Sequence, residues 1–361
     1  MLGKVVAGAL ALLTLASGVN ASEVPAGYPA DYQAVIDGSK REGRLVIYDN
    51  IADANWQYAL PRFREKYPWI TIEMPHLTTN EVHSRWEIES NSGVTTGDIL
   101  MNVDADTWVR VADKMLDYKS PELAALPDFA NPEPGIYVVS TDPFPFVYNT
   151  ALLPNGAQIT NLEKLAEAVK ADPATFNQRV TTYDPLRHAA GIMIWRALMN
   201  KLGEKGWEQA KIIAPIMRPE VSSGPMTEKI VTGEYVFTVA GTGIVAFPKM
   251  AQPGGELIGV TYPSDATVVM QRYVAIPKNS KNVNSAKLLL DFILSQEGQT
   301  LLGKGGLTPY REDVPADQVK HTYKSILKEV PEEALVVVNM NKDVIASTDA
   351  FMKRWRSIVQ K

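Results

Sequence analysis

The sequence contains no cysteine and only four histidines. A chain without cysteine has no disulfide framework, so a buried apolar core has to hold it together. The histidines (His76, His83, His188 and His321) are scattered, and no two of them have the helical spacing typical of a zinc site. We therefore expect no metal site and no bound cofactor.

Long apolar runs are also missing. Val5 to Ala16 form a short apolar run behind Lys4, and Val19-Asn20-Ala21 offers small side chains where a signal peptidase reads. This run is shorter than the roughly 20 residues that span a bilayer, and no later segment comes closer to that length. Residues 1–21 are therefore predicted to be a cleaved export signal, with a retained N-terminal anchor as the alternative.

There is no run of basic residues. The chain has 36 Lys and Arg against 41 Asp and Glu, a formal net charge of −5, which argues against nucleic acid as a partner. An exported chain with no cysteine to carry a lipid anchor is expected to be free in the periplasm of a Gram-negative cell. Removal of 21 residues from 361 leaves enough chain for two domains of ordinary size.

Short apolar runs alternate with longer segments of helical period along most of the chain. This alternation indicates an α/β fold with parallel sheets. The strands are expected at 44–48, 70–74, 98–101, 179–183, 235–240, 257–262 and 268–276. The helices are expected at 55–67, 82–89, 107–114, 160–171, 189–202, 285–299, 322–328 and 349–360.

The alternation restarts after Tyr148-Asn149-Thr150, which divides the chain into two lobes. We expect residues 22–147 plus 275–361 to form the first lobe and residues 148–274 the second. Each lobe is predicted to be a mainly parallel sheet flanked by helices. Because the chain then crosses between the lobes twice, a ligand cleft is expected at the two crossings, where open sheets end.

Eight short motifs follow one another along the mature chain. They are Arg41-Glu42-Gly43, Phe63-Arg64-Glu65-Lys66-Tyr67-Pro68, Gly97-Asp98-Ile99, Val147-Tyr148-Asn149-Thr150, Tyr183-Asp184-Pro185, Ala275-Ile276-Pro277-Lys278-Asn279, Leu294-Ser295-Gln296-Glu297-Gly298-Gln299 and Thr308-Pro309-Tyr310-Arg311-Glu312-Asp313-Val314. On these motifs the chain resembles the periplasmic solute-binding proteins of ABC importers, in the group that includes ferric-ion-binding proteins. The resemblance implies the two-lobed type II binding-protein fold, a small-molecule ligand, an ABC permease as partner, and a monomer.

The first candidate site lies between the strand at 179–183 and the long helix that follows it. Arg187 can hold a carboxylate or phosphate through two hydrogen bonds, and His188 stands beside unpaired backbone N–H groups at the helix start. His188 could donate to an anion, with a protonation that varies between pH 5 and 8. The alternative is that Arg187 pairs with a surface acid and His188 only caps the helix.

Two further candidates are loops rich in hydroxyl and glycine residues. Ser222 and Ser223 precede a helix and are expected to contact the ligand, or else to cap that helix. Thr242 stands between Gly241 and Gly243 after a buried strand, where glycine allows close backbone approach to a ligand. A lone Gly-x-Gly is a weak signal.

The first lobe offers Asn50 and Asp104, which both follow predicted strands at the expected edge of the cleft. Their alternatives are Asx turns and helix caps. Tyr148 and Tyr273 flank the two predicted crossings, where an aromatic ring serves either as hinge packing or as a ligand platform.

The sequence departs from the ferric-binding relatives. The resemblance implies that iron is held there by two adjacent tyrosines after the strand equivalent to 235–240, with a His and a Glu from the first lobe. Here that strand leads into Thr242-Gly243-Ile244, and the first-lobe positions fall near Ala52 and Val103. None of these side chains supplies the anionic oxygen that Fe³⁺ requires, so iron binding is not expected.

The sequence therefore predicts a non-catalytic binding protein for a small organic anion, such as a carboxylate, a phosphonate or a sugar phosphate. A neutral sugar, a polyamine or a ferric ion is the alternative ligand. A periplasmic enzyme is the rival class, but the sequence shows no Gly-x-Ser-x-Gly elbow and no paired carboxylates at a strand end, so no catalytic residue is assigned.

Overall fold

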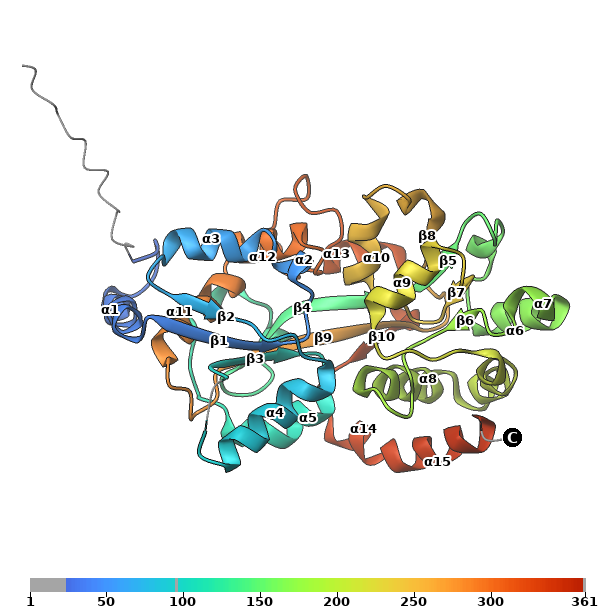
Figure 1. Cartoon of the computed structure of the whole chain (residues 1–361), viewed down its shortest axis with the longest axis horizontal. Helices are drawn as coiled ribbons and strands as arrows, with labels where there is room; N and C mark the ends of the chain where they lie inside the picture. Colours follow the sequence, from blue (N-terminus) through green and yellow to red (C-terminus); the bar gives the residue numbers. More distant parts are fainter. Residues whose placement is uncertain (1–23, 95–96, 360–361) are drawn as a thin grey trace, which may run out of the picture.

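The computed structural model describes residues 24–94 and 97–359. The predicted export signal, residues 1–21, lies outside the described residues. Two β-sheets lie end to end along the longest axis of the molecule (Figure 1). We call the part built on the six-stranded sheet the first half, and the part built on the four-stranded sheet the second half.

The six-stranded sheet has the order β10-β9-β3-β1-β2, and β4 also pairs with β9. β1 is parallel to β2 and β3, whereas β9 is antiparallel to β3 and β4 and parallel to β10. The strands are β1 (Arg44–Asp49), β2 (Thr71–Glu73), β3 (Ile99–Asn102), β4 (Ile136–Phe144), β9 (Thr267–Ala275) and β10 (Leu335–Val338). β4 and β9 are buried along their whole length, so they form a two-stranded spine that crosses the middle of the molecule.

The four-stranded sheet has the order β6-β7-β5-β8. Its strands are β5 (Phe146–Asn149), β6 (Val180–Thr181), β7 (Phe237–Thr238) and β8 (Ile258–Thr261). β6 and β7 are parallel, while β5 is antiparallel to both β7 and β8. The chain enters the second half at Pro145, between β4 and β5, and returns to the first half between β8 and β9.

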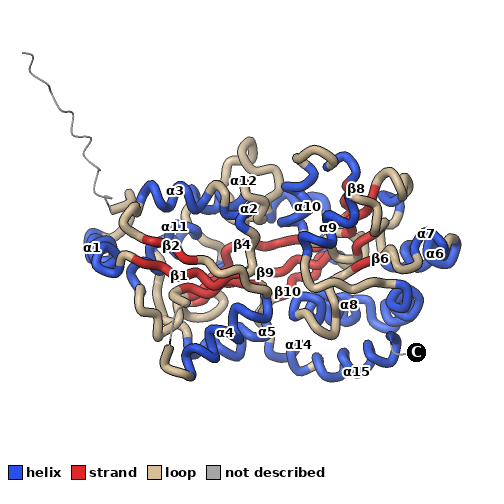
Figure 2. The backbone as a smooth tube through the Cα atoms, viewed as in Figure 1, coloured by secondary structure: helices blue, strands red, loops and turns tan. Residues whose placement is uncertain are grey.

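The helices lie outside both sheets (Figure 2). Those of the first half are α1 (Gln33–Glu42), α2 (Asp53–Trp56), α3 (Ala59–Lys66), α4 (Thr79–Asn91), α5 (Ala105–Val111), α11 (Val283–Leu294), α12 (Gln296–Lys304) and α13 (Tyr323–Glu329). Those of the second half are α6 (Leu162–Ala171), α7 (Pro173–Phe176), α8 (Ala189–Ile213), α9 (Ser223–Val231), α10 (Gly243–Met250), α14 (Lys342–Ala346) and α15 (Thr348–Val359). Among the described residues, no helix is both long enough and apolar enough to cross a membrane.

The apolar core is continuous between the halves. One buried cluster runs from Trp108 and Tyr273 in the first half to Trp195 and Trp355 in the second. The rings of Trp195 and Trp355 lie 4.5 Å apart, which fastens α15 onto α8. Burying such large rings is the main source of stability for a chain without disulfides.

The structure differs from the sequence prediction in strand direction. Both sheets are mixed rather than mainly parallel, because β5 runs antiparallel to two neighbours and β9 to two others. The apolar pattern of a strand predicts its burial but carries no information about its partners. The helix predicted over 285–299 is also two helices, since Ser295 leaves the helical conformation at ψ 161° and its Oγ accepts a hydrogen bond from the N–H of Gly298.

Two segments also lie elsewhere than the predicted lobes placed them. The strand predicted at 268–276, largely within the second lobe, is β9 of the six-stranded sheet. The C-terminal helix, assigned to the first lobe, is α15 and packs on α8 of the second half. Which residues move together as a lobe stays a prediction.

Candidate ligand-binding site

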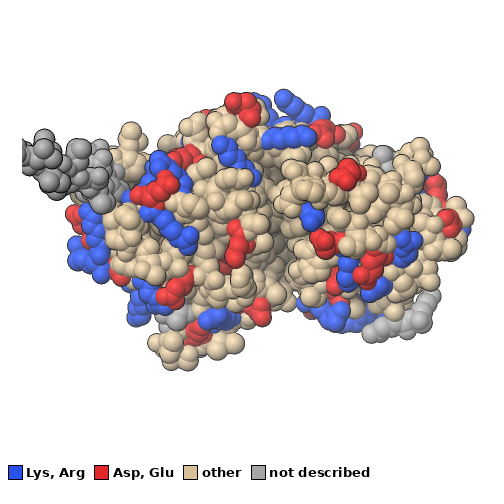
Figure 3. Space-filling model, turned by 45° about the horizontal axis from the view of Figure 1, so that its top comes forward, with Lys and Arg blue, Asp and Glu red and all other residues tan. Residues whose placement is uncertain are grey.

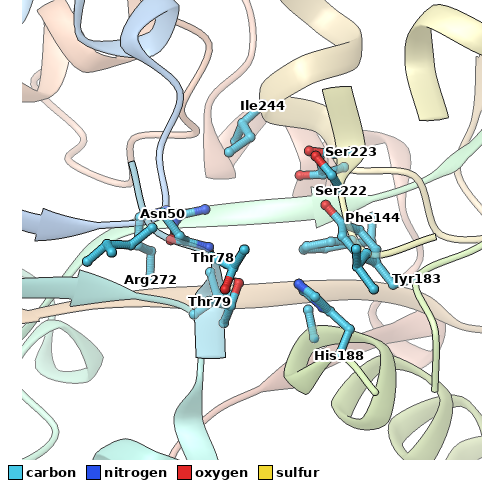
Figure 4. Close-up of a pocket in the computed structure, with 15 residues that line it drawn as sticks. Asn50, Thr78, Thr79, Phe144, Tyr183, His188, Ser222, Ser223, Ile244 and Arg272 are labelled. Carbon is cyan, nitrogen blue, oxygen red and sulfur yellow. Dashed lines mark hydrogen bonds between the residues drawn. The ribbon is translucent and has the colours of Figure 1, made fainter. Parts of the chain in front are cut away.

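A cavity of about 140 Å³ lies between the two halves. Figure 3 shows the molecule hollowed near its middle, where few charged side chains lie. The first half contributes the ends of β1 and β3 and the start of α4 to the cavity wall. The second half contributes the starts of α8, α9 and α10, and the crossing strands β4 and β9 complete the wall (Figure 4).

Five of the nine residues that the sequence indicated line this cavity: Asn50, His188, Ser222, Ser223 and Thr242. Asn50 directly follows β1 in the first half, and the other four stand at the starts of helices in the second half. Figure 4 shows Asn50 on one side of the space and His188, Ser222 and Ser223 on the opposite side. The cavity therefore brings together residues from four separate stretches of the chain.

The starts of four helices meet at the cavity. Thr78 and Thr79 begin α4, and the residues that directly precede α8, α9 and α10 are His188, Ser222 and Thr242. The side chains of His188, Ser222 and Thr242 make no capping hydrogen bond to the helices that follow them. Helix starts in general carry unsatisfied N–H groups and a partial positive charge, which are favourable to a negatively charged group nearby.

Arg272 of β9 is the cationic residue in the wall. Its side chain is 3% exposed, and its Nε and Nη2 donate to the Asp142 carboxylate of β4 at 3.0 and 2.9 Å. Its Nη1 donates to Oδ1 of Asn50 at 2.7 Å, and Nδ2 of Asn50 donates to the Thr79 hydroxyl at 2.7 Å. A buried guanidinium needs such an ion pair, and here the pair holds Asn50 in place.

His188 stands against Tyr183 on the second-half wall. Their rings are stacked with centroids 4.9 Å apart, and His188 is 5% exposed. Burial lowers the pKa of His188 to about 4, and the neighbouring Asp184 acts weakly in the opposite direction. The imidazole is therefore neutral between pH 5 and 8 in this state, and its buried Nδ1 has no hydrogen-bond partner among the described residues.

The rest of the wall is apolar and comes from both halves. Leu77 and Val103 lie on the first-half side, and Val221 and Ile244 lie on the second-half side. The Phe144 ring stands at the end of β4, where the chain crosses. Burial also raises the pKa of the neighbouring Tyr183 phenol to about 12, so that group stays a neutral hydrogen-bonding group.

The sequence profile of one protein family matches residues 59–327, and that family is described as bacterial extracellular solute-binding protein. The matched region covers most of the chain and includes the whole of the second-half wall of the cavity. The chain belongs to this family. A search of the curated proteins gives no match.

Several solved structures share the fold of this solute-binding protein. The substrate-binding protein of an ABC transporter from Agrobacterium tumefaciens superposes with a TM-score of 0.80 at 20% identity, over 88% of this chain and 94% of that one. AfuA from Actinobacillus pleuropneumoniae, with fructose-6-phosphate bound, gives 0.69 at 18%, over 88% and 98%. The apo ferric-ion-binding protein A from Pasteurella haemolytica gives 0.66 at 14%, over 88% and 98%. At these identities the likeness shows the fold.

Arg187 of the solute-binding protein lies outside the cavity wall. Its side chain is 72% exposed, and its Nε donates to the Asp184 carboxylate at 2.6 Å. The anion-binding hypothesis had placed this guanidinium in the cleft. Asp184 lies three residues before it, in the turn that precedes α8, and is buried, so the local pairing directs the guanidinium away from the cavity.

Three other predicted residues also lie outside the wall. Asp104 precedes α5, and its carboxylate accepts a hydrogen bond from the N–H of Thr107. Asp104 is thus a helix cap, which was the alternative to ligand contact in the sequence analysis. Tyr273 donates to Oε1 of Gln271 and accepts from the N–H of Met340. Tyr148 is buried in the core of the second half.

The glycines on either side of Thr242, and Gly259 in β8, serve packing in the solute-binding protein. A Cβ at Gly241 would lie 2.7 Å from the Val147 side chain, and one at Gly243 would lie 2.6 Å from Phe247. A Cβ at Gly259 would lie 2.1 Å from the Tyr148 ring, so that glycine makes room for the tyrosine. These close approaches explain the glycines without a ligand.

Val103 lines the cavity with an apolar side chain. The resemblance to ferric-binding proteins had implied that one of their iron ligands falls near this position. Among the described residues, no group of three or more His, Asp or Glu side chains is arranged to hold a metal ion.

Sequence reasoning missed Arg272, Phe144, Tyr183 and the pair Thr78-Thr79. Two of them carry a signal that could have been used. An Arg inside an apolar strand has to be paired when that strand is buried. Thr78, followed three residues later by Glu81, is a capping-box pattern that marks a helix start, and the Glu81 carboxylate does accept the Thr78 N–H at 2.7 Å.

Proposed function

We propose that this protein is the substrate-binding component of an ABC uptake transporter in the periplasm, acting without catalysis and as a monomer. Its ligand is a small organic anion, which the two halves close upon and deliver to an inner-membrane permease. The family and the likeness to the ABC substrate-binding protein from Agrobacterium tumefaciens support the transport role. The related fold that has fructose-6-phosphate bound supports an anionic ligand.

The observation that carries the ligand class is the meeting of helix starts. α9 and α10 begin at the cavity without a side-chain cap, and α8 also begins there, although its first N–H, that of Ala189, donates to the Asn80 side chain. Hydroxyls of Ser222, Ser223 and Thr242 stand at two of these starts, and they can add hydrogen bonds to an anion that binds the backbone N–H groups.

The wall composition opposes a polyamine. Such a ligand needs carboxylates, and none of the described residues that line the cavity is Asp or Glu. The carboxylate of Asp142 is completely buried behind the wall, and the guanidinium of Arg272 already neutralises its charge.

The test is a thermal-shift screen of the purified mature protein with organic acids, phosphonates, sugar phosphates, neutral sugars and amines, followed by calorimetric titration. A ligand that binds the folded state raises the melting temperature by mass action. The double variant Ser222→Ala/Ser223→Ala should bind the anion at least about tenfold more weakly, since hydrogen bonds to charged groups contribute about 1.5–3 kcal/mol. Thr232→Ala, exposed at the far end of α9, is the matched control.

Two results would overturn the proposal. Stabilisation by neutral sugars or amines alone would replace the anion with another ligand class. Conversion of the bound compound by the purified protein would replace binding with catalysis.

A further inference from the structure

The first turn of α10 contains a carbonyl group that its own helix does not pair in the regular way. In an α-helix a carbonyl oxygen accepts the N–H four residues later, and for Ile244 that residue is Pro248. Proline has no N–H, so the Ile244 carbonyl loses the partner that a regular helix supplies. A buried backbone carbonyl without a partner costs free energy, and Ile244 is 6% exposed, so this oxygen needs a donor from elsewhere.

Asn55 of the first half supplies that donor. Its Nδ2 donates to the carbonyl oxygen of Ile244 at 3.0 Å and to the carbonyl oxygen of Gly305 at 2.6 Å. Gly305 directly follows α12 in the first half, at a helix end where carbonyl groups are left unpaired. Asn55 is 3% exposed, so one buried carboxamide joins a helix of each half.

The neighbouring backbone fits this contact. A Cβ at Gly306 would lie 2.3 Å from Cγ of Pro248 and 3.0 Å from the Ile244 carbonyl oxygen, so glycine lets α10 come this close. Gly306 also has a φ of 102°, a conformation that favours glycine. The ring of Phe247 stacks on His321 of the first half, with centroids 3.8 Å apart. The start of α10 therefore rests on the first half, although the chain enters it from the four-stranded sheet.

The turn before α10 is strained. Ala240 is 3% exposed and has a φ of 53°, a left-handed conformation that residues other than glycine rarely adopt. The N–H of the next residue, Gly241, donates to the carbonyl oxygen of Pro145 at 2.8 Å, where the chain crosses between the halves. Such a conformation persists where the surrounding contacts hold it. The start of α10 is thus fixed by this turn on one side and by Asn55 on the other.

The same first turn forms part of the ligand cavity. Thr242, directly before α10, and Ile244 both line it, and Figure 4 shows Ile244 at the end of the space remote from His188. We infer that Asn55 is a positioning residue, which holds the start of α10 and the Thr242 hydroxyl in place in the cavity wall from the opposite half. This inference rests on the proposed function and deepens it. Its hydrogen bond to Ile244 joins the halves, so its free energy supports the arrangement in which both halves form the cavity.

The test compares two buried asparagines that both donate to backbone carbonyl groups. Asn149→Ala is the matched control for Asn55→Ala, because Asn149 is 2% exposed and donates to the Ile230 carbonyl oxygen at 2.6 Å within the second half. Both variants should be less stable in urea titrations, since each leaves a buried carbonyl without its donor. Only Asn55→Ala should accelerate hydrogen exchange of the first-turn amides of α10 over the rest of the chain, by about fivefold or more.

Calorimetry gives the second readout, with inorganic phosphate, fructose-6-phosphate and acetate as probes. A probe that binds wild type should bind Asn55→Ala at least about fivefold more weakly, and Asn149→Ala within about twofold of wild type. Asn55→Ser keeps one hydrogen-bond donor and should show smaller shifts in the same direction. It serves as the test variant if Asn55→Ala does not fold.

A variant of α10 separates position from stability. Pro248→Ala restores an N–H that can donate to the Ile244 carbonyl within the helix. The double variant Asn55→Ala/Pro248→Ala should therefore regain part of the stability but not the probe affinity, because the link to the first half is still missing. Recovery of both would mean that Asn55 only satisfies a carbonyl, and would overturn the inference.

The outcomes separate the inference from the proposed function. Unchanged exchange in α10, or equal acceleration along the whole chain, would overturn the inference. An unchanged affinity of Asn55→Ala for a probe that binds wild type would also overturn it and leave the proposed function standing. If no anion of the wider screen binds wild type, the proposed function falls, and the exchange measurement by itself decides whether Asn55 positions α10.

Discussion

The side-chain oxygen of Asn80 accepts a hydrogen bond from the backbone N–H of Ala189 at 3.1 Å. Asn80 belongs to the first turn of α4 in the first half, and Ala189 is the first residue of α8 in the second half. The Asn80 amide also donates to the carbonyl oxygen of Arg187 at 3.2 Å. One carboxamide thus joins the two halves beside the cavity, next to Thr79 on one side and His188 on the other.

Removing this link should weaken ligand binding. Asn80→Ala deletes two exposed hydrogen bonds that link the two halves, and each such bond contributes about 0.5–1.5 kcal/mol. We expect the ligand affinity to fall about fivefold, because the ligand then has to draw the halves together without the link. Calorimetry with Asn91→Ala, at the other end of α4, as control measures the effect. An equal affinity for both variants contradicts the role of Asn80.

Truncation of Arg187 should have little effect on affinity. Its guanidinium is largely exposed and paired with Asp184, so it offers no desolvated contact to a ligand in the cavity. Arg187→Ala should change the dissociation constant by less than about threefold, as exposed ion pairs typically contribute about 0–1 kcal/mol. A loss of thirtyfold or more would mean that Arg187 swings into the cavity when ligand binds.

Truncation of Arg272 should destabilise the fold. Arg272→Ala leaves the fully buried Asp142 without its partner, a change that typically costs about 3–5 kcal/mol. The double variant Arg272→Met/Asp142→Asn removes both charges and should recover most of the free energy of unfolding, measured by urea titration. Recovery of stability without recovery of ligand affinity would show that the pair also orients Asn50. If the single variant is as stable as wild type, the pair does not support the fold.

Acidification should destabilise the protein through His83. Burial lowers its pKa to about 3, against roughly 6.5 in the unfolded chain. Between these values the unfolded state binds the extra proton, so the stabilising contribution is complete above about pH 6.5 and is lost as the pH falls. His83→Phe keeps the edge-on packing against Trp108, whose ring centroid lies 4.6 Å away, and removes the titration.

The stability of His83→Phe relative to wild type should therefore increase by about 1.4 kcal/mol per pH unit below about pH 6. Urea titrations at pH 7 and pH 5 measure the difference. His76→Phe, at a side chain 84% exposed, controls for the replacement of a histidine by a phenylalanine. A His83→Phe curve that runs parallel to wild type would rule out His83 as the titrating group.

The C-terminal helix should contribute strongly to stability. Trp355 is 1% exposed and contacts Trp195, with ring centroids 4.5 Å apart, and Phe351, at 5.8 Å. Trp355→Ala should lower the free energy of unfolding by about 3–5 kcal/mol. Arg356→Ala, at the exposed neighbouring position, should change it by less than about 0.5 kcal/mol. Similar values for the two variants would mean that α15 is not part of the core.

Much of the local structure could be predicted from sequence because its causes are local. Asn161 caps α6 at the start of the helix expected over 160–171, and its side chain accepts the N–H of Lys164 at 2.8 Å. Residues at helix starts, such as Ser222 and Thr242, could be proposed as site residues because cap positions follow from a few neighbouring residues. The same local pattern was compatible with two positions of Arg187, since it does not tell whether Asp184 or a ligand receives the guanidinium.

Sequence patterns alone are enough to predict the alternation of strands and helices, the need for a buried core without disulfides, and the membership of a solute-binding family. Tertiary structure alone decided which of the proposed residues meet. Arg272 and Asp142 stand far apart along the chain, and only the antiparallel pairing of β4 with β9 puts them side by side. Likewise α15 packs on α8 because two tryptophans bury each other there. Strand partners and ring contacts depend on distant residues, and a periodic pattern along one segment carries no record of them.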